Sequence, residues 1–426
     1  MPEFDPNLIE PLTVAEDVHH HAKPPTSADA ATGKHRRALW LMLFTIFLDV
    51  LGFGILSPVI PYLLQRYDKS ALIVGTLMMS FSIAQFFAAP VLGALSDRYG
   101  RRPILLISIF GGAVAYIAFG FATALWVFFA ARIIDGLTGG NISTAQAYIT
   151  DITPPKDRSK TFGLIGAVFG AGFIIGPALG GVLSYVSLQA PAFAAGGLSL
   201  LACIFGFFMM PETLPPTRRA KKLRLHEMFN PIAQLWRYVS ARDIMTIFAA
   251  RFILMFAMTT MRSNFLVYAR DRLGLGPHQV GYFYAFLGFL IVMVQGGLVR
   301  RVAPKLGDKL MTLVGFISMI IGFTGMGFAP DVYGVVVCML FIGCGHGLSF
   351  PALTGMASTA VDDSEQGGIL GAQQSVNSVA MIIAPFVAGL AFDHISMGAP
   401  YLIAAGMLLI AVWISWNWRA TKPVTA

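Results

Sequence analysis

Residues 93–103 read Gly-Ala-Leu-Ser-Asp-Arg-Tyr-Gly-Arg-Arg-Pro, a short basic turn between two long apolar segments. In this turn one carboxylate lies within a cluster of arginines, one glycine permits a close helix contact, and a glycine and a proline can end one helix and begin the next. The residues concerned are Gly93, Asp97, Arg98, Gly100, Arg101, Arg102 and Pro103. The stretch therefore predicts a charged junction between two apolar helices.

The composition indicates that this chain lies in a membrane. Its 426 residues are 56% hydrophobic and only 12% charged, and the mean hydropathy is +0.69. Soluble proteins carry about twice this charged fraction, so we expect lipid to be the solvent. A net charge of +8 would suggest nucleic acid in a soluble protein. Here the basic residues cluster in short loops between apolar segments, and we expect no nucleic-acid partner.

Twelve apolar segments are long enough to cross a bilayer, for which a helix needs about 20 residues. They predict an all-α membrane protein with twelve transmembrane helices in two six-helix halves. The segments are 39–64, 72–96, 103–122, 125–150, 162–187, 192–211, 244–270, 278–300, 309–329, 332–360, 367–392 and 399–418.

Basic residues are distributed unequally between the two sides of the predicted helices. Of the 30 Lys and Arg residues, 23 fall on the side of the N-terminal tail, three lie inside helices, and four fall opposite, namely Arg66, Lys69, Arg270 and Arg272. Cytoplasmic loops carry the excess of positive charge, so both termini are expected in the cytoplasm.

The polar segments divide the chain further. Residues 1–38 are expected to form a disordered cytoplasmic tail, and 419–426 a cytoplasmic C-terminus. The halves 39–211 and 244–418 are joined by a cytoplasmic linker, 212–243. The linker carries a basic run and then an amphipathic stretch through Phe229, Ile232, Leu235 and Trp236, which predicts a segment lying on the membrane surface. A binding segment for a partner protein is the alternative interpretation.

The two halves repeat a short pattern. Gly176-Pro177-Ala-Leu-Gly180-Gly181 recurs as Ala384-Pro385-Phe-Val-Ala388-Gly389, and Gly163 maps onto Gly371 at the same spacing of 208 residues. Small residues beside a proline in matching helices indicate duplicated halves that pack through close helix contacts.

The fifth predicted helix is unusually rich in glycine. Glycines every few residues make a smooth face for a neighbouring helix, and the proline adds a kink. The residues are Gly163, Gly172, Gly176, Pro177, Gly180 and Gly181. A generic tight helix crossing is the simpler interpretation, but it explains one pair of glycines rather than the whole spacing.

Asp49 lies about ten residues into the first predicted helix, hence roughly 15 Å deep at 1.5 Å per residue. An ionised carboxylate is costly at that depth, which favours proton exchange. No basic residue lies one turn away in the sequence, and Gly52 and Gly54 leave room for water or substrate. Asp49 is therefore our first candidate for the residue that carries a coupling proton.

Asp135 is the other deep acid, and Arg132 precedes it by three residues, a spacing that places both on one face of a helix. Arg132 could tune or gate a carboxylate by approaching it in one conformation only. The alternative is a structural pair in which the two charges neutralise each other, because intramembrane charges are usually paired whatever their role.

The second half contributes fewer polar side chains. Candidates for lining a substrate cavity are Arg262, Gln295, His346, Gln374 and Asn377. Arg251 lies nearer the cytoplasmic side, where its side chain can reach the interface.

The turn matches the pattern G-x-x-x-D-R-x-G-R-R and resembles the loop between the second and third helices of major facilitator superfamily transporters. The glycine-rich fifth helix resembles the pattern that marks the antiporter branch, and the order of motifs over residues 40–395 is similar to the drug:proton antiporter group, tetracycline-efflux-like proteins in particular. The resemblance implies that Arg132 takes part in proton transfer, and that Asp151 pairs with an arginine of the turn as a conformational latch. An ordinary charge at a helix end is the alternative for Asp151.

The chain also departs from the tetracycline exporters. Ala115 and Met319 stand where those proteins have aspartates, and Ile291 stands where they have a histidine, whereas Asp49 and Gln295 persist. The resemblance therefore implies the fold and antiport, and leaves the substrate open.

The expected function is a proton-coupled antiporter that exports amphiphilic or lipophilic small molecules, as in multidrug efflux. The alternatives are an exporter or symporter of an endogenous metabolite or lipid-like molecule, and a membrane receptor or scaffold that transports nothing. We expect a monomer in the bacterial inner membrane, driven by the proton gradient with no cofactor and no metal. No nucleotide loop or nucleophile constellation indicates an enzyme.

Overall fold

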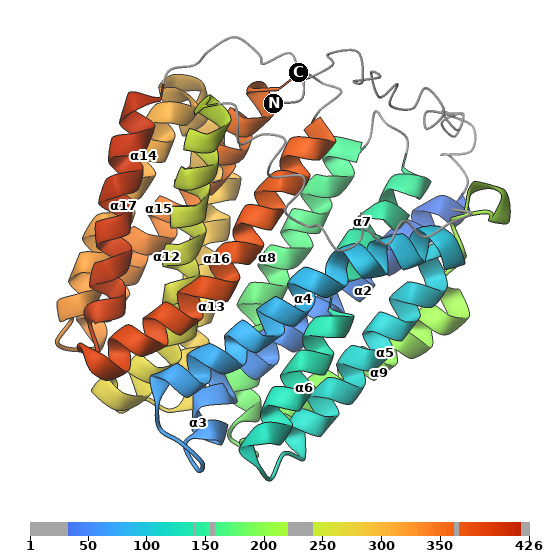
Figure 1. Cartoon of the computed structure of the whole chain (residues 1–426), viewed down its shortest axis with the longest axis horizontal. Coiled ribbons are helices and arrows are strands. Elements are labelled where there is room, and N and C mark those ends of the chain that lie inside the picture. The colour runs from blue at the N-terminus through green and yellow to red at the C-terminus, as the bar shows by residue number, and fades with distance from the viewer. Residues whose placement is uncertain (1–32, 140, 154–157, 220–241, 362–365, 419–426) are drawn as a thin grey trace, which may run out of the picture.

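A computed structural model describes residues 33–139, 141–153, 158–219, 242–361 and 366–418 of the chain. These residues form two groups of helices that lie side by side (Figure 1), one from each half of the sequence. The expectations for the tail up to residue 32, for the amphipathic stretch of the linker and for 419–426 lie outside the described residues.

The first half begins with a helix that is bent where two prolines, Pro58 and Pro61, follow its first long section. That section starts at Gly33, so the helix begins before the predicted end of the tail at residue 38. The elements of this half are α2 (Gly33–Leu56), η2 (Ser57–Val59), α3 (Ile60–Leu64), α4 (Ala71–Tyr99), α5 (Arg101–Gly120), α6 (Leu125–Thr138), α7 (Asn141–Ile152), α8 (Arg158–Leu183) and α9 (Ala190–Met209).

The second half follows the linker, whose described residues 212–219 contain the short turn η4 (Pro216–Arg218). The predicted turn between its second and third spans is itself helical as far as Gly307, whose φ of +69° produces a sharp kink. The elements are α12 (Arg242–Leu273), α13 (Pro277–Met293), the π-helical η5 (Val294–Leu298), α14 (Val299–Phe328), α15 (Val332–Thr359), α16 (Gln366–His394) and α17 (Ala399–Asn417).

All twelve predicted spans lie on helices. Ten helical runs in the described part of the chain are long and apolar enough to cross a membrane, and the 52-residue run Pro277–Phe328 contains two predicted spans. The remaining span is divided between α6 and α7, of 14 and 12 residues. The expected all-α membrane architecture is therefore confirmed.

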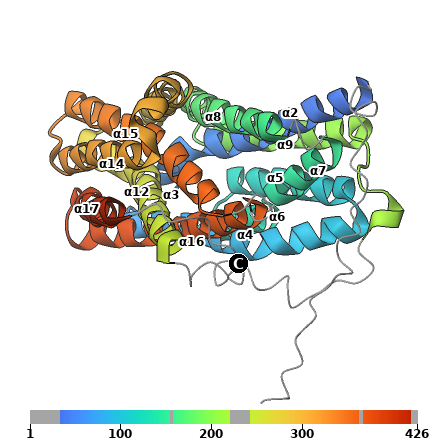
Figure 2. The ribbon, with the colours of Figure 1, turned by 90° about the horizontal axis from the view of Figure 1, so that it is seen from above.

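The bundle has two chemically different ends. We call the end where α2 begins, α17 ends and the turn 93–103 lies the basic end, and the opposite end, with α3 and the start of α4, the far end. In both views α4 lies beside α16 (Figures 1 and 2), and the two helices diverge from the far end towards the basic end in Figure 1.

Two equivalent backbone contacts join the halves near the far end. A Cβ atom added to Gly281 on α13 would lie 2.3 Å from the carbonyl oxygen of Pro177 on α8, and one added to Gly75 on α4 would lie 2.2 Å from that of Pro385 on α16. Both distances are too short for a side chain. Because Pro177 and Pro385 are matching residues of the repeat, the duplicated pattern makes the same contact twice.

The glycine-rich face of α8 also packs within its own half. A Cβ on Gly180 would lie 2.0 Å from the Ile55 carbonyl oxygen, and one on Gly176 would lie 2.8 Å from the Cα atom of Gly54 on α2. Gly181 instead faces α13, where its Cβ would lie 3.0 Å from the Cα atom of His278. The pattern thus lets α8 approach one helix of each half.

Hydrogen bonds strengthen the far end. The Tyr62 hydroxyl donates to the Leu275 carbonyl at 2.5 Å. The Arg270 guanidinium donates across the halves to the carbonyl oxygens of Pro61 and Lys69, at 3.1 and 2.8 Å. The conformation is therefore one in which the far end is closed.

We predict that Gly281→Ala opens the far end. The new methyl group must displace α8 or α13, and overpacking of this kind costs about 1–3 kcal/mol. The change should raise the reactivity of a cysteine placed at Ser57, in the bend of the first helix, towards a membrane-impermeant maleimide added from the far side.

Gly197→Ala provides the matched control, because a Cβ at Gly197 meets nothing within 4 Å. Equal reactivity in the two variants would show that the Pro177 contact does not hold the far end closed.

Candidate functional site

The turn 93–103 is organised around the guanidinium of Arg101. Its Nη1 atom lies 2.5 Å from the Asp97 carboxylate and 2.7 Å from the Ser96 hydroxyl. Its Nε atom donates to Asp151 on α7 at 3.2 Å. Asp151 therefore lies against an arginine of the turn, as the resemblance implies, and these contacts are all made within the first half.

Glu212 holds the turn from the other side. Its carboxylate accepts hydrogen bonds from the backbone N–H groups of Arg101 and Arg102, at 3.0 and 3.2 Å. A carboxylate at a helix N-terminus is favourable, and here it offsets two arginines in the first turn of α5. Gly100 has a φ of +111°, and a Cβ there would lie 2.3 Å from Glu212, so the position requires glycine.

The remaining residues of the turn make short-range contacts. Arg102 donates to the Phe207 carbonyl oxygen, and the Arg98 guanidinium lies 5.4 Å from the centre of the Tyr99 ring. Gly93 faces Ser143 on α7. Burial raises the pKa of the Asp151 carboxyl, and Arg101 partly opposes this increase.

Arg132 and Asp135 form a buried ion pair on α6. Arg132 Nη1 lies 2.7 Å from Asp135 Oδ2, and the residues are only 3% and 6% exposed. The guanidinium also lies 5.4–5.9 Å from the ring centres of Phe53, Phe81 and Phe119. This is the pairing that we gave as the structural alternative, and it surrounds the arginine with aromatic faces from α2, α4 and α5.

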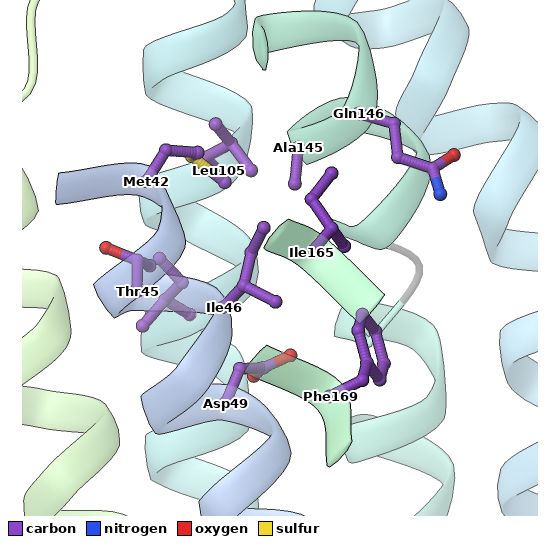
Figure 3. Close-up of a pocket in the computed structure, with 10 residues that line it drawn as sticks. Met42, Thr45, Ile46, Asp49, Leu105, Ala145, Gln146, Ile165 and Phe169 are labelled. Atoms are coloured by element: carbon purple, nitrogen blue, oxygen red, sulfur yellow. The ribbon is translucent and has the colours of Figure 1, made fainter. Parts of the chain in front are cut away.

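Asp49 belongs to the same region of the first half. Tyr116, buried on α5, lies within electrostatic range of Asp135, Asp49 and Arg132. Figure 3 shows the Asp49 carboxylate projecting from α2 into a small pocket, towards the side formed by Phe169 of α8. The other lining residues labelled in Figure 3 are Met42, Thr45, Ile46, Leu105, Ala145, Gln146 and Ile165.

A second and larger cavity, which we call the central cavity, lies between the halves; it has a volume of about 40 Å³ and is partly open to solvent. Arg132 faces it from the first half and Arg262 from the second. The Phe53 ring lies near both, with its centre 5.9 Å from the Arg132 guanidinium and 5.7 Å from that of Arg262. The other lining residues are Ser57, Ile60, Met78, Phe81, Ser82, Thr259, Ser263, Met381 and Pro385.

The other second-half candidates lie outside this cavity lining. Asn377 accepts a hydrogen bond from Arg251 Nε at 3.0 Å and donates to Gln374. Arg251 is 3% exposed and also donates to Thr354 and the Phe350 carbonyl. The Arg251 side chain is therefore buried and hydrogen-bonded inside the second half. The expectation that it reaches the membrane interface is wrong.

His346 and Gln295 lie on different helices of the second half. The His346 ring packs 5.4 Å from the Phe350 ring on α15, and Gln295 lies on the π-helical η5. The phenylalanines around Arg132 were not predicted individually, because nothing in the sequence distinguishes them among 34 phenylalanines.

Comparison with known proteins agrees with this geometry. A family model described as the Major Facilitator Superfamily matches residues 42–382 and again 301–426. The chain belongs to the major facilitator superfamily. Members of this superfamily are transporters, and the helices show that this one is a multi-pass integral membrane protein.

Two curated relatives and one solved structure illustrate the similarity. The class C tetracycline resistance protein of Escherichia coli is 33% identical, over 89% of this chain and 96% of its own length. Multidrug resistance protein 2 of Bacillus subtilis strain 168 is 27% identical over 90% and 95%. The crystal structure of a human organic anion transporter, 23% identical, superposes with a TM-score of 0.69 over 89% of this chain and 99% of that one.

One polar contact of this facilitator has no counterpart in the sequence patterns. Asp393, near the end of α16, accepts hydrogen bonds from the Ser70 hydroxyl at 2.5 Å, from Ala71 N at 3.0 Å and from Leu72 N at 2.9 Å. An acid of the second half thus caps the N-terminus of α4 in the first half. No local signal predicts it, because the partners are more than 320 residues apart.

We predict that Asp393→Ala weakens the closed far end, because it removes the acceptor for two backbone N–H groups. Loss of a helix cap costs about 0.5–2 kcal/mol. Spin labels at Gln65→Cys and Ile395→Cys, in a background without Cys203, Cys338 and Cys344, should report a population at longer distance. Asp393→Asn keeps an acceptor oxygen and should shift the distances less; identical distributions for Asp393→Ala and the parent would refute the role of this cap.

A further prediction concerns Asp97, whose carboxylate is 52% exposed at the basic end. Asp97→Asn should impair transport into inside-out vesicles while the amount of protein in the membrane stays normal, since it removes a charge that contacts Arg101 in this conformation. Asp68→Asn is the control, because an amide still accepts the bond from Ser70 N. Full transport by Asp97→Asn would leave Asp97 as an ordinary loop charge.

Proposed function

We propose that this protein is a proton-coupled antiporter that exports amphiphilic or lipophilic small molecules from the cytoplasm. The observation that carries the proposal is the buried Arg132–Asp135 ion pair. Its arginine faces the central cavity, and its charges lie within electrostatic range of the same tyrosine as Asp49. Coupling of proton movement to substrate movement requires an ionisable pair beside the cavity between the two halves.

The basic end faces the cytoplasm in this proposal. The unequal distribution of Lys and Arg supports that orientation, with both termini on the cytoplasmic side of a bacterial inner membrane. The contacts between α3 and α12 and between α4 and α16 close the far end. The conformation is therefore the one that opens inward. Export then requires those contacts to break in the alternate state.

Protons act through the two acids of the first half. Protonation of Asp135 cancels the charge that neutralises Arg132, so the guanidinium becomes a net positive charge at the cavity wall. Asp49, which lies within electrostatic range of Tyr116 as Asp135 does, also exchanges protons. An interaction that changes with protonation and differs between two conformations biases their equilibrium. The proton gradient is therefore the proposed energy source, without a cofactor.

The names of the relatives leave the substrate class open, because they refer to tetracycline resistance, multidrug resistance and organic anion transport. Ala115 and Met319, which replace two aspartates of the tetracycline exporters, are buried in helix packing, at 1% and 0% exposure. These positions offer no charge to a cationic tetracycline–metal complex. We therefore propose amphiphilic compounds broadly, rather than tetracycline.

The proposal is tested in liposomes that contain the purified protein and a pH-sensitive dye. Compounds are added one at a time, and the sign of the pH change that accompanies their movement distinguishes antiport from symport. Proton movement opposite to substrate supports the proposal. Movement in the same direction would identify a symporter, and no substrate-dependent change for any compound would contradict proton coupling.

We predict that Asp49→Asn abolishes uphill, proton-driven accumulation to the level of protein-free liposomes, while exchange of substrate down its gradient continues. The amide mimics the protonated carboxyl and cannot release a proton. A change of one pKa unit corresponds to about 1.4 kcal/mol, enough to bias two states separated by a few kcal/mol.

Asp331→Asn is the matched control for this experiment. Asp331 caps α15 through Gly334 N, and asparagine is an equally good cap, so the variant should accumulate substrate normally. Retained accumulation in Asp49→Asn with loss in Asp135→Asn would transfer the coupling role to Asp135. Normal pumping by both would refute the mechanism.

A further inference from the structure

The central cavity contains a positive charge that the protein does not neutralise. Arg132 is paired with Asp135 at 2.7 Å, but within the described parts of the chain no carboxylate forms an ion pair with Arg262. The guanidinium of Arg262 instead lies 4.9 Å from the centre of the Phe173 ring and 5.7 Å from that of Phe53. Ring faces attract a cation, but they supply no acceptor for its N–H groups.

Arg251, on the same helix, shows what a structural arginine looks like in this protein. Its guanidinium donates to Asn377, Thr354 and the carbonyl oxygen of Phe350. Among the described residues, the Arg262 guanidinium donates to no such oxygen. A buried or half-buried arginine normally has all its donors satisfied, so those of Arg262 remain for water or for a ligand in the cavity.

The rest of the cavity wall suits an amphiphile. Met78, Phe81 and Met381 offer apolar and adaptable surface. Thr259 and Ser263 lie on the same wall as Arg262, on α12. The Ser263 hydroxyl donates to the Thr260 carbonyl oxygen at 3.4 Å, and a threonine hydroxyl can donate to an anionic oxygen. No acidic residue is among those that line this cavity in the described structure.

We propose that the cavity binds amphiphilic organic anions, with the guanidinium of Arg262 as the anion-binding group. This inference rests on the proposed export function and names its substrate class. An arginine presents a planar fork that matches carboxylate and sulfonate oxygens, while the apolar body of the ligand packs on the phenylalanine and methionine side chains. A cation would face two guanidiniums, and the carboxylate of Asp135, which is paired with Arg132, is not among the lining residues.

The test uses three probes that share one ring system and differ in charge: 2-naphthalenesulfonate, 2-naphthalenesulfonamide and 2-naphthyltrimethylammonium. Their binding to the full chain in detergent is measured by isothermal titration calorimetry. The sulfonate should bind most tightly and the ammonium most weakly. Arg262→Gln should weaken sulfonate binding about tenfold or more, the factor that corresponds to losing a charge-assisted hydrogen bond, and should leave sulfonamide binding nearly unchanged.

Two further variants separate charge from structure. Arg262→Lys keeps the positive charge and should retain most of the sulfonate affinity, whereas Arg66→Gln, which removes an exposed far-end charge, should have no effect. Ammonium binding equal to or tighter than sulfonate binding, no binding of the sulfonate, or unchanged sulfonate affinity in Arg262→Gln would overturn the inference.

Because these readouts measure binding, they stay separate from the test of export. Sulfonate binding that depends on Arg262 in a protein that moves no protons would refute antiport and leave the anion site standing. Proton-coupled export of the ammonium compound alone would support antiport and refute the anion site.

Discussion

The arrangement of this protein depends on two places where backbones touch without side chains between them. At each place the carbonyl oxygen of a proline, Pro177 or Pro385, lies against a glycine of the other half. Without a hydrophobic driving force between helices in lipid, such close packing is a main source of helix association. These contacts fix the pairs α8–α13 and α4–α16 near the far end, and α4 and α16 diverge from there towards the basic end (Figure 1).

The two halves of the bundle contain different buried charges. The first half holds both deep acids, Asp49 and Asp135, together with the arginine that pairs with one of them. The second half holds Arg251 and Arg262, and the described residues place no carboxylate beside either. Because isolated charges are expensive in a membrane, this asymmetry agrees with the proposal that the first half handles protons and the second half binds the charge of the ligand.

The sequence was sufficient to predict the elements that depend on composition and spacing. Apolar length predicted the spans, the glycine spacing predicted the close face of α8, and the three-residue interval predicted the Arg132–Asp135 contact. Contacts between segments that are far apart in the chain could not be predicted from residue spacing or composition. Glu212 and Asp393 satisfy helix ends that are more than 100 residues away, and a lone acid has the same appearance in sequence whether it caps a helix or faces water.

Arg251 shows a different limit. Depth along a helix suggested that its side chain reaches the membrane interface, but depth says nothing about which neighbours face it. Phe350, Thr354 and Asn377 come from α15 and α16, and only the packing of those helices against α12 brings their oxygen atoms to the guanidinium. The same packing decides which few of the many phenylalanines surround Arg132.

The position of Phe53 has a thermodynamic consequence. One ring lies close to two guanidiniums, that of Arg132 in the first half and that of Arg262 in the second. A displacement of the ring therefore changes the surroundings of both cations at once. Linkage between two binding events is reciprocal. If occupancy at Arg262 alters how readily the Arg132–Asp135 pair takes up a proton, then the state of that pair alters affinity at Arg262 by the same factor. Under the proposed mechanism, a single aromatic side chain therefore links the two sites in both directions.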